Sequence, residues 1–235
     1  MNSVLSLHFC MLNFPIVLPQ RKFSTFETLT GQGKSFSLRE ICQKNVISCL
    51  DMPLIKLMVS ALEASGCKID PTRHFACDIC KPGRDIQNFG GYDEELNQVF
   101  FCADNATSSG LVHGVLLRNL IHMFDVCTKK VDFQNVDHLA CMEVRKANLA
   151  NCNYALYLAR TDAHFAVKKQ HQICVENTAV DFLVKTKFVD QKLAEEAVKR
   201  VFPKCYNDLE PIGRRSKHIY DMKQAEREKY LFGYE

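Results

Sequence analysis

The spacing of apolar positions divides much of the chain into amphipathic helices. Leucine and methionine side chains recur at intervals of three and four residues over 53–64, which predicts a helix there. Similar spacing predicts further helices over 107–127, 138–151, about 154–176 and 191–202. The helix over 107–127 is the central one in the sequence, and Val115, Leu120, Ile121 and Phe124 are among its apolar positions.

The segment 67–105 has a different period. HFACDIC, the Gly90-Gly91-Tyr92 stretch and NQVFFC resemble short strands around a turn, and their cysteines would pin a small hairpin. The chain is therefore predicted to be α+β, mostly helical, with a small β element before the central helix.

The first 40 residues are predicted to form an N-terminal arm and linker, followed by a single domain over 41–235. His8, Asn13 and Pro15 interrupt the apolar start, which is too short to span a bilayer and lacks a basic leader region. A targeting segment and a loosely attached arm both fit it. Residues 21–40 are polar and contain Gly and Ser, so they are expected to be linker. Any membrane association is predicted to be peripheral.

Composition excludes few functions but argues against nucleic-acid binding. Of 235 residues, 47% are hydrophobic and 24% charged, as in ordinary globular proteins, and the formal net charge is only +3. No stretch alternates aromatic and basic residues as single-strand binders do. No nucleic-acid partner is expected.

The chain contains twelve cysteines spread along its length. A disulfide framework formed in an oxidising compartment is the favoured explanation, and a set of buried free thiols is the alternative. A zinc ribbon built on Cys77-x-x-Cys80 is disfavoured because no second close cysteine pair follows it.

The sequence RNLIH, residues 118–122, has the rhythm of the zinc-protease motif H-E-x-x-H. Arg118 has no lone pair with which to bind a metal, and Asn119 cannot take a proton from a bound water. Of the required elements only His122 remains. A lone histidine on an apolar helix is more often structural than a ligand.

Other residues near this motif in sequence could complete a metal site. Glu143, on the next predicted helix, is where a two-helix zinc site would find its third ligand, and Asp125 is a second candidate. The structural alternative for Glu143 is an ion pair with Arg145, with Lys146 or with Arg118. In the last case a salt bridge would replace the metal.

Several motifs occurring in one order resemble a known family. RHFACDIC at 73–80 fits R-H-F-x-C-x-x-C, LIHMFDVC at 120–127 fits L-I-H-A-F-D-x-C, and HLACMEVRKANLANC at 138–152 closely fits H-L-A-C-x-E-x-R-A-x-N-L followed by a cysteine. The GGYD stretch, KQHQICV and FPKCYNDLEPIGR match further blocks, so most of 42–215 is covered. The chain resembles the mitochondrial inner-membrane zinc metallopeptidases that act in ATP synthase maturation.

This resemblance implies a zincin-like metallopeptidase core with zinc as its cofactor. It also implies a location at the inner membrane, on the intermembrane-space side, and a role in processing the precursor of the proton-channel subunit and in assembling the ATP synthase membrane sector. Cys10 and Cys49 lie outside the family's pattern. Ten cysteines lie in or beside the matching blocks and are disulfide candidates: Cys42, Cys67, Cys77, Cys80, Cys102, Cys127, Cys141, Cys152, Cys174 and Cys205.

The departure from the family motif H-E-L-I-H decides the functional hypotheses. The first is a catalytically silent assembly factor that binds zinc weakly or not at all. The alternative is an active zinc metalloendopeptidase in which His122, Glu143 and either Asp125 or His138 hold the metal. A disulfide-rich binding protein unconnected with ATP synthase is a third class, and the run of motifs argues against it.

Overall fold

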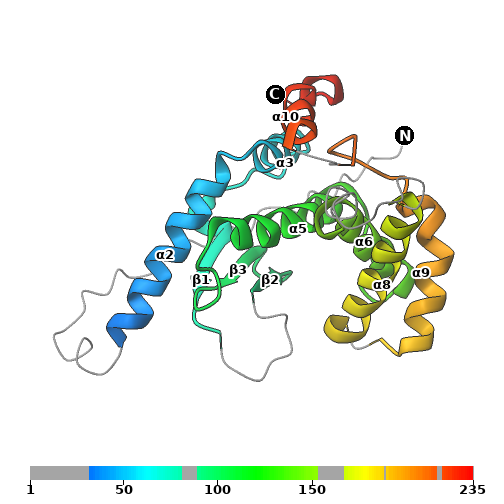
Figure 1. Cartoon of the computed structure of the whole chain (residues 1–235), viewed down its shortest axis with the longest axis horizontal. Helices are drawn as coiled ribbons and strands as arrows, with labels where there is room; N and C mark the ends of the chain where they lie inside the picture. The colour runs from blue at the N-terminus through cyan, green and yellow to red at the C-terminus, as the bar shows by residue number, and fades with distance from the viewer. Residues whose placement is uncertain (1–31, 81–88, 153–166, 188, 216–218, 235) are drawn as a thin grey trace, which may run out of the picture. The chain divides into compact units, whose positions relative to one another are not determined.

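The computed structural model describes residues 32–80, 89–152, 167–187, 189–215 and 219–234 (Figure 1). The chain divides into two units, Met1–Gly33 and Lys34–Glu235, and almost all of the described residues belong to the second. The two alternatives for the N-terminal segment, a targeting segment or a loosely attached arm, concern residues that lie outside the described part of the chain.

The mostly helical α+β class is confirmed. The strands are β1 (Phe75–Asp78), β2 (Gly90–Asp93) and β3 (Gln98–Cys102). The helices are α2 (Gln32–Leu50), α3 (Pro53–Ala64), α4 (Pro71–His74), α5 (Ser109–Thr128), α6 (Val136–Lys146), α8 (Val167–Lys187), α9 (Gln191–Cys205) and α10 (Ile219–Arg227), with a π-helical turn η1 (Ala147–Asn151) and a 3-10 turn η3 (Lys229–Phe232).

Two helix predictions need correction. Residues 32–40, expected to be linker, form the start of α2 instead. Cys42, Val46 and Cys49 recur on one face of α2 and are buried, so tertiary packing stabilises a helix whose first half is polar. The helix predicted to end near 176 continues to Lys187, and its expected start lies outside the described residues.

The sheet has the order β1-β3-β2, in which β1 runs parallel to β3 and β2 antiparallel to it. The predicted hairpin is therefore β2–β3, with β1 added at the other edge of β3. Gly90 has φ +146°, and a Cβ at this position would lie 2.3 Å from the carbonyl oxygen of Phe100. Glycine is required here because only it combines this backbone conformation with so close an approach.

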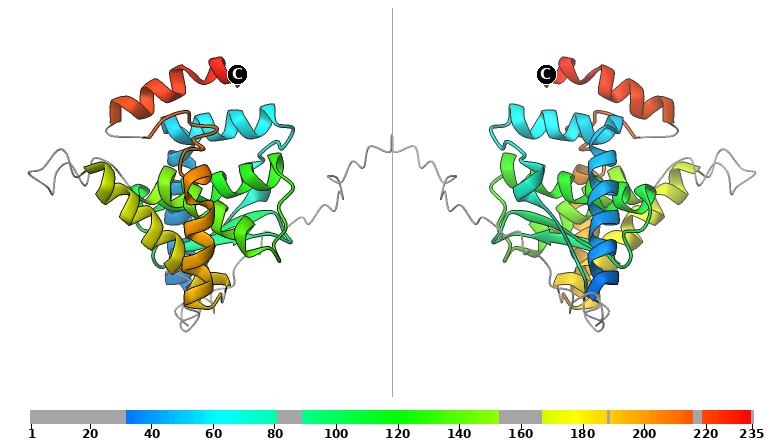
Figure 2. Two further views of the ribbon diagram at one scale, coloured as in Figure 1. Left: turned by 90° about the vertical axis from the view of Figure 1, so that its right-hand side faces the viewer. Right: turned by 90° about the vertical axis from the view of Figure 1, so that its left-hand side faces the viewer.

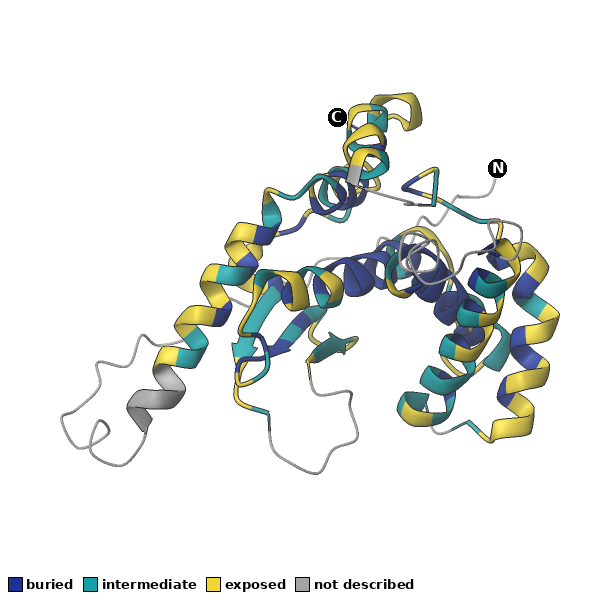
Figure 3. Ribbon diagram, in the orientation of Figure 1, coloured by how far each residue is buried: buried dark blue, intermediate teal, exposed yellow. Residues whose placement is uncertain are grey.

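The buried apolar side chains form two clusters. One is built from α2, α3, the sheet and α5, and the other from α6, η1, α8 and α9. The two largely buried helices α5 and α6 lie where the clusters meet (Figure 3). Helix α3 packs against α5 and also against α10, which lies over it (Figure 2).

The prediction that the ten motif cysteines pair is confirmed by five disulfides. They are Cys42–Cys77, Cys67–Cys127, Cys80–Cys102, Cys141–Cys205 and Cys152–Cys174. Cys77 and Cys80 belong to different bonds, so they form no zinc ribbon. Cys49 is a buried free thiol that donates to the carbonyl oxygen of Ser109 at 3.3 Å.

Among the described helices, none is by itself both long and apolar enough to cross a bilayer. The pair Ser37–Leu50 and Pro53–Ala64, bent by 78°, meets the length and composition criteria only when both helices are counted together.

Candidate functional site

Three of the predicted site residues come together where α5 crosses α6, namely Arg118, His122 and Glu143. The side chain of Ser108 caps α5 and that of Asn135 caps α6, which fixes where each helix begins. Arg118, His122 and Asp125 are spaced i, i+4 and i+7 on α5, so they share one face, and all three are buried. Helix α6 presents buried charged residues to this face, so the helix contact is polar at its centre.

Glu143 of α6 is paired on both of its carboxylate oxygens. Arg118 donates to Oε2, and the Nζ of Lys146 lies 2.5 Å from Oε1. Burial alone would raise the pKa of Glu143, but the two neighbouring cations outweigh it and hold that pKa below its usual value. The ion pair between Arg118 and Glu143 is confirmed, and Lys146 is a second partner.

The imidazole of His122 is held neutral. Lys146 donates to its Nδ1 at 3.0 Å, which assigns the remaining proton to Nε2. Burial, and then the charges of Lys146, Lys187 and Arg118, keep the pKa of His122 well below its ordinary value. Nε2 is buried and has no hydrogen-bond partner among the described residues. The nearest carboxylate oxygen, Oε1 of Glu94, is 3.7 Å away, too far for a hydrogen bond.

The two altered motif positions have structural contacts. The guanidinium of Arg118 donates to Oδ1 of Asn151 and lies 3.5 Å from the ring centroid of Phe182. The amide of Asn119 donates to the carbonyl oxygen of Val115 at 2.8 Å, one turn back on the same helix. Asn119 therefore hydrogen-bonds its own helix at the position where a protease places its general base.

This arrangement does not fit a zinc ion. Zinc needs lone pairs from at least three protein ligands in a catalytic site. Here Lys146 and Arg118 use the oxygens of Glu143, and Lys146 also uses Nδ1 of His122. Within the described ranges, no group of three His, Cys, Asp or Glu side chains is placed to hold a metal.

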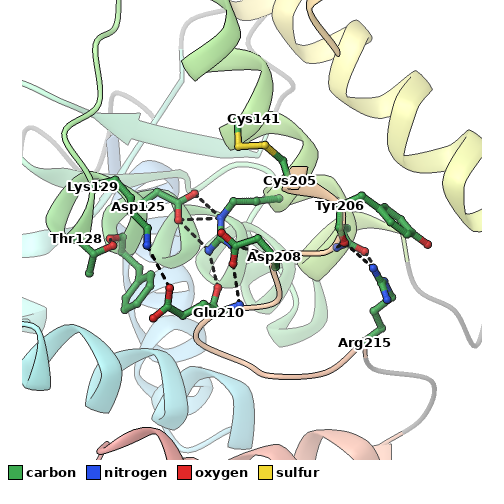
Figure 4. A network of polar contacts seen from close by, with 12 residues as sticks. Asp125, Thr128, Lys129, Cys141, Cys205, Tyr206, Asp208, Glu210 and Arg215 are labelled. Carbon is green, nitrogen blue, oxygen red and sulfur yellow. Dashed lines mark hydrogen bonds and ion pairs between the residues drawn. A yellow bond between two sulfur atoms is a disulfide. The ribbon is translucent and has the colours of Figure 1, made fainter. Parts of the chain in front are cut away.

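The other two candidate ligands, Asp125 and His138, contact other groups. Asp125 accepts from Nε of Arg145 at 3.0 Å, and the same guanidinium reaches Asp208 and the carbonyl oxygen of Glu210 (Figure 4). Through Arg145 of α6, these contacts connect the segment after α9 to Asp125 of α5. His138 is exposed, and its Nδ1 accepts from the backbone N–H of Asp132 at 3.0 Å. Neither residue shares a site with His122.

Sequence reasoning did not identify Lys146, Glu94 and Lys187 as members of this site. Lys187 pairs with Glu94 at 2.8 Å beside His122. Lys146 was considered only as a partner for Glu143, yet the family motif H-L-A-C-x-E-x-R-A-x-N-L has alanine at its position. That substitution, three residues after Glu143, was the available signal. No local sequence signal predicts the pairing of Glu94 with Lys187, because 93 residues separate them.

Comparison with known proteins gives one consistent result. The model of the Peptidase M76 family matches residues 40–213. The human protein named "Mitochondrial inner membrane protease ATP23 homolog" is 36% identical over 182 residues, which are 76% of this chain and 72% of the relative. The Xenopus laevis protein of the same name is 38% identical over 196 residues, 82% of this chain and 81% of the relative.

A more distant relative agrees. "Mitochondrial inner membrane protease atp23" of Schizosaccharomyces pombe is 28% identical over 162 residues, 68% of this chain and 84% of the relative. No solved structure matches this chain. The comparisons therefore define a protein of the metallopeptidase class. The chain belongs to the Peptidase M76 family, whose curated relatives compared above are named as mitochondrial inner membrane proteases.

Proposed function

We propose that this chain is a catalytically silent member of the M76 family, with a zincin-like core in which basic side chains have replaced the metal. The observation that carries the proposal is the state of Glu143, whose two oxygens are paired with Arg118 and Lys146. Asn119 adds to it, since an amide cannot deprotonate a water. Ligation and base catalysis are thus lost independently.

The proposed role is that of a peripheral assembly factor for the ATP synthase membrane sector, on the intermembrane-space side of the inner membrane. The names of the relatives support a location at the mitochondrial inner membrane. The five disulfides are typical of proteins in an oxidising compartment. The role in assembly rests on the family resemblance. Protease protection and carbonate extraction of mitochondria test the location, and co-purification with membrane-sector subunits tests the role.

An active zinc endopeptidase is the second candidate. In its favour is the buried Nε2 of His122, which has no hydrogen-bond partner among the described residues and faces Oε1 of Glu94 at 3.7 Å. These two groups supply one ligand fewer than the three that catalytic zinc sites use.

Metal analysis of the purified, oxidised full chain separates the two candidates. The silent protein should contain well under one zinc per chain after purification from zinc-supplemented cells, and it should cleave no peptide library. One zinc per chain, lost to a chelator together with peptidase activity, would establish the second candidate instead.

A further inference from the structure

The last described residues carry the most exposed large hydrophobic side chains of the described part of the chain. Tyr220, Tyr230 and Leu231 expose 73%, 67% and 65% of their surface. Lys223 and Arg227 are also exposed and lie with Tyr220 on one face of α10, at i, i+3 and i+7. Tyr230 and Leu231 are exposed on the 3-10 turn η3 that follows α10. We refer to these five side chains as the C-terminal stripe.

The opposite side of α10 fixes the direction of the C-terminal stripe. Ala225 is buried, Met222 packs against the first apolar cluster, and Tyr234 anchors the end of the chain in it. The Nζ of Lys229 donates to Oγ of Ser60 on α3 at 2.8 Å. Helix α10 lies over α3 in both views of Figure 2. By helical spacing, the three stripe residues on α10 lie on the side of this helix opposite to Met222 and Ala225, and so away from α3. All five side chains of the stripe are exposed.

In this segment the basic and acidic side chains differ in their exposure to solvent. The exposed charged side chains of α10 and η3 are both basic, Lys223 and Arg227, whereas Asp221, Glu226 and Glu228 are half-buried. Glu228 is also neutralised by an ion pair with Arg214. By contrast, the outer face of α9, also an amphipathic helix, exposes both acidic and basic residues and one leucine. Of these two helical segments, only the C-terminal stripe combines aromatic, aliphatic and basic side chains without an exposed acid.

We propose that the C-terminal stripe is the surface by which this protein lies on an anionic lipid bilayer. Tyrosine is enriched at the interface between a bilayer and water, and leucine inserts at the boundary between headgroups and acyl chains. Lysine and arginine extend their charged ends to the lipid phosphate groups. Exposed cations without neighbouring exposed acids complement a negative membrane surface. The proposal rests on the membrane location proposed above but not on the silence of the altered metal site.

The absence of tryptophan from the sequence makes a direct test possible, because one introduced indole reports on one position. The test uses the oxidised full chain carrying Leu231→Trp, mixed with vesicles of phosphatidylcholine alone or with about one fifth phosphatidylglycerol. The expected result is a blue-shifted emission, quenched by brominated lipid, on the anionic vesicles. Leu96→Trp is the control, since Leu96 is 59% exposed on the turn between β2 and β3. It should show neither effect.

Charge removal gives the second measurement. Lys223→Gln with Arg227→Gln should lower partition onto the anionic vesicles by ~30-fold, whereas Lys192→Gln with Lys199→Gln on α9 should leave it within about twofold. Both variants keep the buried face of their helix, and circular dichroism confirms that they are folded. The proposal is overturned if Leu231→Trp shows no lipid quenching, or if its emission shifts without vesicles as the chain dimerises. Either result leaves the zinc analysis, and thus the silent-site proposal, unaffected.

Discussion

Lys146 places a positive charge between His122 and Glu143, two of the predicted metal ligands. Its ammonium contacts both His122 and Glu143. Burial lowers the pKa of Lys146 from 10.5 to about 8, so it is still mostly charged near neutral pH. The altered motif residues Arg118 and Asn119 are therefore not the only obstacles to zinc, and any repair of the site has to include Lys146.

Repair of the H-E-L-I-H motif is the first prediction. Arg118→His with Asn119→Glu restores the motif but leaves the Lys146 ammonium between His122 and Glu143, so zinc binding should be weak. Adding Lys146→Ala should bring stoichiometric binding. Without zinc, the triple variant should lose ~3 to 5 kcal/mol of unfolding free energy, because Glu143 is left buried and unpaired. The measurements are zinc titration and melting curves with and without zinc.

The control for this repair is Asn119→Glu with Lys146→Ala, which lacks the second histidine and should bind no stoichiometric zinc. Stabilisation by zinc should appear only in variants that carry the new histidine. A folded triple variant that binds no zinc would falsify the interpretation of RNLIH as an altered H-E-x-x-H.

His171 is the basis of a second prediction, on acid stability. Its ring is fully buried, its Nδ1 accepts from the Tyr206 hydroxyl at 2.9 Å, and its Nε2–H donates to the carbonyl oxygen of Cys152 at 2.8 Å. Burial lowers its pKa from 6.5 to about 4. Between these values the unfolded chain binds the extra proton and the folded chain does not, so the free energy of unfolding falls as pH drops from 6.5 to 4, by as much as ~3 kcal/mol.

Urea unfolding of the oxidised protein at pH 7 and pH 4.5 measures this effect. His171→Gln should unfold with a smaller difference between the two pH values than the parent. The exposed His138 offers a matched control, and His138→Gln should keep the parental difference. Equal pH dependence in both variants would contradict the assignment to His171.

At the scale of elements, disulfides join helices that pack on one another through the second apolar cluster. Cys141–Cys205 connects α6 to α9, and Cys152–Cys174 connects the residue after η1 to α8. Both lie in the second apolar cluster, where α6, α8 and α9 pack on one another. This cluster contains many small side chains, so covalent links add to modest apolar burial.

The third prediction concerns these links. Cys141→Ser with Cys205→Ser should lower the free energy of unfolding by ~2 to 4 kcal/mol, because the unfolded chain gains the freedom of a loop that the bond had closed. Denaturant unfolding of parent and variant measures the loss. Thiol titration of the denatured, unreduced parent should find no more than two free thiols among its twelve cysteines, since ten are paired. Ten or more free thiols in protein from its native compartment would disprove the framework.

At the scale of the second unit, Lys34–Glu235, two apolar clusters are joined across a polar seam between α5 and α6. Arg118 with Glu143, His122 with Lys146 and Asp125 with Arg145 line this seam. Buried ion pairs add little net stability but are costly to break singly, because the remaining charge is left unpaired. Loss of one partner in any pair of the seam is therefore expected to destabilise the contact between the two clusters.

The fourth prediction compares two ion pairs that both involve α6. Arg145→Ala leaves Asp125 buried without a counter-ion and should lower the free energy of unfolding by ~3 to 5 kcal/mol. Arg200→Ala breaks an exposed pair with Asp137 of α6, 2.7 Å apart, and should cost less than ~1 kcal/mol. Denaturant unfolding of both variants tests the contrast, and similar losses would show that the seam is not a special feature.

Local sequence patterns determined much of this protein. The apolar period over 53–64 places α3 at those residues, because a helix repeats every 3.6 residues whatever surrounds it. The same period puts Arg118, His122 and Asp125 on one face, and the residue types at 118 and 119 exclude ligation and base chemistry without a structure. The number of cysteines and their spread along the chain indicated a disulfide framework, because composition alone carries that signal.

Contacts between distant residues were decided only by the tertiary structure. Which cysteines pair, how Lys146 contacts both His122 and Glu143, and why Glu94 meets Lys187 all depend on how helices pack. Several packings would satisfy the same periodicity, and the free energy of burying whole faces selects among them. The start of α2 at Gln32 has the same cause, since burial of Cys42, Val46 and Cys49 outweighs the weak helix preference of the polar residues before them.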